Sequence, residues 1–152
     1  MANEQTFVML KPDSLQRGTV GEVISRFEKK GLQLKALKML KIDRKLAETH
    51  YGEHQGKSFY NALVDFITSS PVLVSVWEGE NAIHIVRKLV GATRAEEAQP
   101  GTIRGDFAIS TTCNLVHASD AIATAEREIN LFFKPDEIYD YPLTINEWFY
   151  RE

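Results

Sequence analysis

The chain has 152 residues, of which 43% are hydrophobic and 26% charged, so we expect one globular domain spanning residues 1–152. Its net charge of −3 and isoelectric point of about 5.8 argue against nucleic-acid binding through overall positive charge. The single Cys113, the absence of an apolar run near ~20 residues and a start that does not resemble a signal peptide exclude an internal disulfide and a membrane span, and predict a cytoplasmic protein.

The first forty residues predict a strand, a helix and a second strand. The apolar run Phe7-Val8-Met9-Leu10 predicts a buried strand that ends at the turn Lys11-Pro12-Asp13. Apolar side chains at helical spacing over residues 20–27 predict a helix that ends at Gly31. Residues 32–42 alternate and then change phase, which predicts a long strand with a bulge or bend.

Helices dominate the prediction for the middle of the chain. Residues 44–54 and the apolar positions between residues 59 and 67 predict two helices. Residues 72–77, which follow Pro71, are rich in strand-forming types and predict a strand. Residues 81–90 predict a helix that Asn81 caps and Gly91 ends.

The last third begins with a stretch, residues 91–106, that has no clear period and contains Pro100-Gly101. We predict a loop there, and long loops in compact domains are often functional. Residues 107–109 and 114–117 predict short strands, and residues 120–133 predict the last long helix. This order of elements predicts an α/β sandwich, either doubly wound or with a split βαβ, ferredoxin-like arrangement.

The segment Asn114-Leu115-Val116-His117-Ala118-Ser119-Asp120 carries the clearest chemical signal. It places His117 between an apolar run and the start of a helix, where a mostly neutral imidazole can act as a nucleophile. Ser119 and Asp120 are good helix caps, and a helix N-terminus attracts phosphate. Taken alone, His117 is better interpreted as a structural histidine beside an ordinary helix cap, because most histidines do no chemistry.

Several common catalytic motifs are absent from the sequence. The segment Gly52–Ser58 resembles a phosphate-binding P-loop, but it has three residues between its glycines instead of four and follows a helical stretch. Dinucleotide-binding and protein-kinase glycine motifs, zinc-binding motifs and the serine-hydrolase motif do not occur. Arg87, Thr93 and Arg104 are suited to binding phosphate oxygens, although each also fits a solvated surface position.

Taken together, these segments resemble one enzyme family. The segment from Asn114 to Asp120 resembles the active-site signature of nucleoside diphosphate kinases, which is usually Asn, two residues, His, Gly, Ser and Asp. The resemblance covers essentially the whole chain. Further markers are Phe7-Val8-Met9-Leu10-Lys11-Pro12-Asp13, Gly101-Thr102-Ile103-Arg104-Gly105-Asp106-Phe107 and Ala125-Glu126-Arg127-Glu128-Ile129.

The resemblance implies a fold and a reaction. The fold is a ferredoxin-like βαββαβ sandwich of the α+β class, with a four-stranded antiparallel sheet, helices packed on it and a long protruding loop. The reaction transfers the γ-phosphate of a nucleoside triphosphate, typically ATP, to a nucleoside or deoxynucleoside diphosphate. His117 matches the family nucleophile, which forms a phosphohistidine through Nδ1 in a ping-pong cycle.

The resemblance also assigns the surrounding residues. Glu128 matches the carboxylate that pairs with the nucleophile, and Ser119 matches the residue that bridges to that glutamate. Tyr51 matches a residue whose hydroxyl lies beside the catalytic histidine. Phe59 and Leu63 match the base slot, and stacking there implies broad base specificity. The remaining matches contact the sugar or the phosphates: Lys11, His54, Arg87, Thr93, Arg104 and Asn114. Mg²⁺ is implied as the cofactor, held mainly by nucleotide phosphates and water, with no dedicated metal site in the protein.

Two positions depart from the family pattern. Ala118 replaces the usual glycine, so we expect an ordinary backbone conformation there and preserved catalysis. Thr111 stands where an apolar residue often touches the base. The C-terminal tail resembles those of hexameric members, so we expect a homohexamer, with a tetramer as the alternative. A non-catalytic nucleotide-binding module and a nucleic-acid-binding protein are the competing functions, and the retained histidine and arginines and the acidic balance weigh against them.

Overall fold

Four strands form one antiparallel sheet in the computed structural model, which describes residues 3–151. The strands are β1 (Asn3–Leu10), β2 (Gln33–Leu40), β3 (Val72–Glu80) and β4 (Val116–Ala118), in the order β2-β3-β1-β4. Every neighbouring pair is antiparallel, which excludes the doubly wound alternative and confirms the ferredoxin-like fold. The predicted bulge is also present, as a register shift between Leu34 and Ala36.

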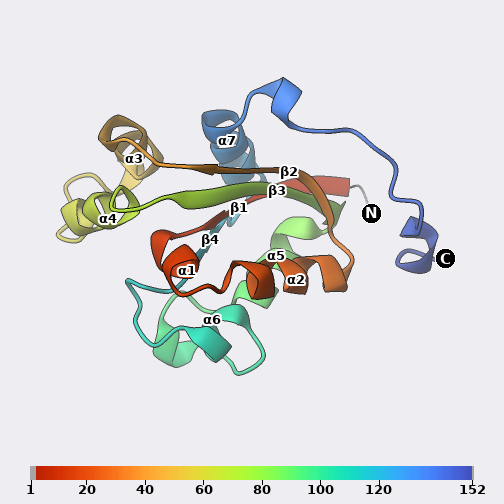
Figure 1. The fold of residues 1–152 in the computed structure, drawn as a ribbon, viewed down its shortest axis with the longest axis horizontal. Helices are drawn as coiled ribbons and strands as arrows, with labels where there is room; N and C mark the ends of the chain where they lie inside the picture. Colours follow the sequence, from red (N-terminus) through yellow and green to blue (C-terminus); the bar gives the residue numbers. More distant parts are fainter. Residues whose placement is uncertain (1–2, 152) are drawn as a thin grey trace.

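Helices cover both faces of the sheet and extend beyond one end of it (Figure 1). Their bounds are α1 Pro12–Gln16, α2 Val20–Lys30, α3 Arg44–His50, α4 Tyr60–Ile67, α5 Ala82–Val90, α6 Ile103–Phe107 and α7 Ile122–Phe132. Short 3₁₀ turns lie at Gly52–His54, Ala95–Glu97, Pro135–Glu137 and Asn146–Trp148. None of the helices within residues 3–151 is long and apolar enough to cross a membrane.

The central strand β1 divides the core into two layers. Its side chains alternate between the two faces of the sheet, so Phe7 and Met9 pack with residues of α3, α4 and α7. Val8 and Leu10 point the other way and pack with residues of α2 and α5. Figure 1 shows α7 on one side of the sheet and α2 with α5 on the other. All four side chains are at most 1% exposed, so β1 is a rigid support for the segment that begins at residue 11.

Four predictions about local structure were wrong. Residues 91–106 contain the start of α6, which Thr102 caps by accepting a hydrogen bond from the Gly105 N–H. Residues 107–109 are not a strand, because Phe107 ends α6. Ser119 and Asp120 do not cap α7, whose N-cap is Ala121. Pro12–Gln16 forms the helix α1, where a turn was expected. Five-residue helices such as α1 and α6 are too short to show a hydrophobic period.

Candidate active site

One cavity, of about 450 Å³, gathers side chains from both halves of the chain. A larger hollow of about 550 Å³ beside α7 has no cationic lining residue, so the smaller cavity is the better anion site. Its lining includes ten of the twelve residues that the sequence predicted: Lys11, Tyr51, His54, Phe59, Leu63, Arg87, Thr93, Arg104, Asn114 and His117. Ser119 and Glu128 lie behind the cavity wall, in contact with His117 or with each other.

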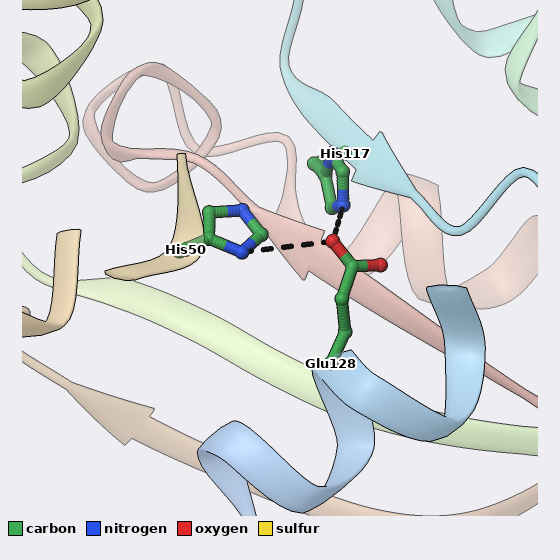
Figure 2. Close-up of side chains that lie close together, drawn as sticks. All are labelled: His50, His117 and Glu128. Carbon is green, nitrogen blue, oxygen red and sulfur yellow. Dashed lines mark hydrogen bonds and ion pairs between the residues drawn. The ribbon is translucent and has the colours of Figure 1, made fainter. Parts of the chain in front are cut away.

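His117 is the part of the cavity wall best suited to react. It lies on β4, whose pairing with β1 places it opposite Met9. Its Nε2 lies 2.6 Å from Oε2 of Glu128, and its side chain is 28% exposed (Figure 2). Because an ionised carboxylate can only accept, the ring proton belongs on Nε2. No described residue bonds Nδ1, which keeps its lone pair for a substrate.

Glu128 is a buried carboxylate held by two donors. It lies on α7 and is 1% exposed; its Oε1 accepts a hydrogen bond of 2.6 Å from Oγ of Ser119. Burial alone would raise the pKa of Glu128, but the hydrogen bonds from His117 and Ser119 outweigh it and leave the pKa below its usual value. Ser119 therefore orients Glu128, which explains why its hydroxyl is not used as a helix cap.

The backbone before β4 is held in an unusual conformation. Leu115 is fully buried and has φ of 72°, in the left-handed region that residues other than glycine rarely adopt. Its N–H donates to Oδ2 of Asp13, and its carbonyl accepts from the N–H of Lys11. These two bonds stabilise the strained turn that sets the approach to His117. Ala118 is not among the positive-φ residues, which confirms its expected ordinary backbone.

Three cations surround the space in front of His117. Arg104 is 4% exposed and donates to the carbonyl oxygens of Gly91, Asn114 and Val116. Burial, and then the nearby charge of Arg87, lowers the pKa of Arg104 to about 10, so it stays charged at neutral pH. Arg87 donates to the carbonyl of Ala118. The alternative of a solvated Arg104 is therefore wrong.

Lys11 is the third cation and is 7% exposed. Burial, and then the charge of Arg104, lowers the pKa of Lys11 to about 8. Among the described residues, its Nζ donates one long hydrogen bond of 3.4 Å, to the carbonyl of Thr112, and lies 5.8 Å from the centroid of the Phe66 ring. A buried ammonium with so little compensation is suited to gain an anionic partner.

Polar and aromatic groups complete the rim. Asn114 donates from Nδ2 to the carbonyl of Thr93, and its buried Oδ1 has no partner among the described residues. Phe59 is 46% exposed and lies one turn before Leu63 at the cavity, and Nζ of Lys57 lies over its ring, 5.8 Å from the centroid. Tyr51 is buried at the end of α3, and burial raises the pKa of its hydroxyl to about 12.

Three residues outside the predicted set of twelve also shape this site: His50, which was not singled out from the sequence, Asp13, and Thr111, which was noted as a departure from the family pattern. His50, at the end of α3, is 3% exposed, and its Nδ1 lies 3.6 Å from Oε2 of Glu128. Asp13 holds the Leu115 turn; the motif that contains Asp13 was noted from the sequence, but the residue was given no role. The Oγ of Thr111 accepts from the N–H of Ala95 at the cavity edge. A histidine that ends a helix gives no local signal that it faces a carboxylate 78 positions away in the chain.

A metal ion could be considered in two places. Donor atoms of His50, His117 and Glu128 lie within 4.8 Å of one another, but the 2.6 Å contact between His117 and Glu128 leaves no room for an ion between them. The residues that line the cavity include no carboxylate. A cation in this cavity would therefore need phosphate oxygens and water as its ligands.

Comparisons with known proteins agree with this geometry. The profile of a family described as nucleoside diphosphate kinase matches residues 4–138. Nucleoside diphosphate kinases from Archaeoglobus fulgidus and Pyrococcus horikoshii are 58% and 54% identical; both alignments cover 98% of this chain, and 99% and 96% of those relatives. A halophilic nucleoside diphosphate kinase from Halobacterium salinarum in complex with CDP superposes with a TM-score of 0.97 at 48% identity, covering 99% of this chain and 100% of that one.

Proposed function

Because the chain belongs to the nucleoside diphosphate kinase family, we propose that His117 carries the phosphate between its two nucleotides. The enzyme transfers the terminal phosphate of a nucleoside triphosphate to a nucleoside diphosphate. The observation that carries the proposal is the geometry of His117: Nε2 is held by Glu128, no described residue bonds Nδ1, and the residue lines a cavity that three cationic side chains also line.

In the first half-reaction, the Nδ1 lone pair of His117 attacks the γ-phosphorus. A nitrogen–phosphorus bond forms as the bond to the β,γ-bridging oxygen breaks, and that electron pair leaves with the nucleoside diphosphate. The ring keeps its Nε2 proton, so the phosphorylated imidazole gains positive charge, which the Glu128 carboxylate stabilises. In the second half-reaction, a terminal oxygen of the new diphosphate attacks phosphorus, and the pair returns to Nδ1.

The cations and the Asn114 amide are assigned to the nucleotide. Lys11, Arg87 and Arg104 lie where the negative charge of the phosphates accumulates, so they can stabilise the transition state. Tyr51, His54 and Thr93 supply further polar contacts at the wall of the cavity. The unpartnered Oδ1 of Asn114 is suited to accept from a sugar hydroxyl. Mg²⁺ would offset phosphate charge, held by phosphate oxygens and water.

The setting of the enzyme is also proposed. Residues 1–152 would form a single domain in the cytoplasm, and the one free cysteine, which is exposed, fits a reducing compartment. A homohexamer is expected from the tail resemblance, with a tetramer as the alternative. The exposed Trp148 and Phe149 in that tail fit a subunit contact, which light scattering would test.

A labelling experiment tests the proposed cycle directly. Incubation with γ-labelled ATP and Mg²⁺ should give acid-labile label on the protein, and adding GDP should move that label to GTP. Label that transfers only when both nucleotides are present together would contradict a ping-pong cycle.

Base binding through Phe59 and Leu63 should be indifferent to the base. Every base offers a π face, so kcat/KM for GDP and CDP should agree within about tenfold. Phe59→Ala should raise KM for both roughly tenfold, while Tyr139→Ala, outside the cavity, should leave both unchanged. If kcat/KM for GDP and CDP differed by several orders of magnitude in the unmodified enzyme, that result would contradict base binding by stacking.

Lys11 should give the reaction an alkaline limit. Its pKa of about 8 means that the free enzyme loses this cation as the pH rises through that value. Because kcat/KM reports ionisation of the free enzyme, it should fall above about pH 8. Lys11→Arg keeps the charge and should remove this limb. An unchanged alkaline limb in that variant would assign it to another group.

A further inference from the structure

His50 lies directly behind the nucleophile, in a position that the proposed cycle does not use. Its ring meets the ring of His117 edge-on, with centroids 4.9 Å apart and planes at 86°. Figure 2 shows both histidines approaching the same oxygen of Glu128, His117 from β4 and His50 from the end of α3. His50 therefore shares the carboxylate without facing the substrate.

The environment of His50 is unusual for a polar ring. It is 3% exposed, and neither nitrogen has a hydrogen-bond partner among the described residues. At 3.6 Å, its Nδ1 lies just beyond hydrogen-bond distance of Oε2 of Glu128, close enough for an N–H dipole there to be attracted to the carboxylate. Burying an imidazole whose two nitrogens make no hydrogen bond costs free energy of folding, unless the ring dipole interacts with a neighbouring charge.

The ring is held neutral by its surroundings. Burial, and then the nearby His117, lowers the pKa of His50 to about 3, against the opposing effect of Glu128. Arg127 and His54 also lower it, and the Tyr51 ring packs against His50. A neutral imidazole that faces a carboxylate presents N–H, so the favoured tautomer has its proton on Nδ1.

We propose that His50 is a positioning residue: its neutral ring directs an N–H dipole at Oε2 of Glu128 and holds the carboxylate against Nε2 of His117. Because His50 carries no charge, it steadies the carboxylate without neutralising it. The full negative charge of Glu128 then stabilises the positively charged ring that forms when His117 accepts phosphate. This role rests on the proposed function of His117.

Two substitutions separate positioning from packing. His50→Phe keeps the ring and its edge contact with His117 but removes the N–H. His50→Asn loses the ring volume but keeps an amide N–H near the position of Nδ1. Positioning predicts that Phe lowers the single-turnover rate of phosphohistidine formation about tenfold, equivalent to about 1.4 kcal/mol, with little change in KM, and that Asn retains most of the rate. A packing role predicts the reverse order.

The acid limb of the pH profile gives a second readout. The His50 dipole stabilises the ionised form of Glu128, which His117 and Ser119 also contact. Removing it in His50→Phe should raise the pKa of Glu128 and move the acid limb of kcat/KM to higher pH, and Asn should restore it. An unmoved limb in the Phe variant would overturn the proposal.

The unmodified enzyme offers a test that needs no variant to fold. Nitrogen-15 spectra should show His50 neutral at pH 7 with its proton on Nδ1, and His117 with its proton on Nε2. A proton on Nε2 of His50 would overturn the inference. The labelling experiment distinguishes failure of the proposed function from failure of the His50 role. If the unmodified enzyme forms no phosphohistidine, the proposed function is wrong. If labelling is normal and His50→Phe has wild-type kinetics, only the role of His50 is wrong.

Discussion

Replacing His117 with glutamine is expected to abolish phosphate transfer, lowering kcat/KM by about four orders of magnitude or more. Glutamine is close in length and can still bond Glu128, but its amide nitrogen has no available lone pair. Without a nucleophile there is no covalent intermediate, and two polyphosphates would have to react directly across their mutual repulsion. The measurements are steady-state kinetics and the acid-labile label after incubation with γ-labelled ATP.

A matched control is available on α5. His84 is exposed and lies outside the cavity that contains His117, so His84→Gln should label and turn over as the unmodified enzyme does. Thermal unfolding should show that both variants are folded. Undiminished labelling of the His117→Gln protein would remove His117 from the proposed role.

Arg104→Met should damage both stability and activity. Methionine has a similar length but cannot donate, so the carbonyls of Gly91, Asn114 and Val116 would lose their common partner. Breaking this buried network should cost about 3 kcal/mol and lower Tm by roughly 10 °C. Loss of a fixed cation beside the phosphates should also reduce kcat by about 100-fold or more.

Arg94→Met provides the comparison for this arginine. The Arg94 side chain is exposed, and within residues 3–151 it bonds only Glu96, so its loss should leave both Tm and kcat close to those of the unmodified enzyme. Differential scanning calorimetry and steady-state kinetics measure the two effects. Equal behaviour of the two variants would contradict a special role for Arg104.

Elements with a strong local period were predicted well. Val23 and Phe27 are fully buried on α2, and Gly31 ends that helix with φ of 104°, as its position predicted. The run from Phe7 to Leu10 was predicted from its continuous apolar character instead: alternate side chains of a strand point to opposite faces, so a run that is apolar throughout is buried on both faces of the sheet. The short α6 was missed because a single helical turn has too few residues to show a period.

The roles of polar residues were harder to infer. Residue by residue, Glu128 and Arg104 fit solvated positions, yet they are 1% and 4% exposed. Only the resemblance to a family suggested that they belong to one site. Burial of a charge depends on partners far along the chain, here His117 and Ser119 for Glu128. Local composition carries no information about such pairs.

The amino-acid sequence by itself determined the strands and long helices, because each follows from the period of its own apolar residues. Through its motifs it also identified the family, and it pointed to His117 as the proposed nucleophile. The family resemblance implied that Ser119 bridges to Glu128, but only the tertiary structure decided that Ser119 does not cap α7, and that His50 faces the same carboxylate. Those relations join β4, α3 and α7, and packing in three dimensions, not spacing along the chain, sets which polar groups share a buried, low-dielectric space.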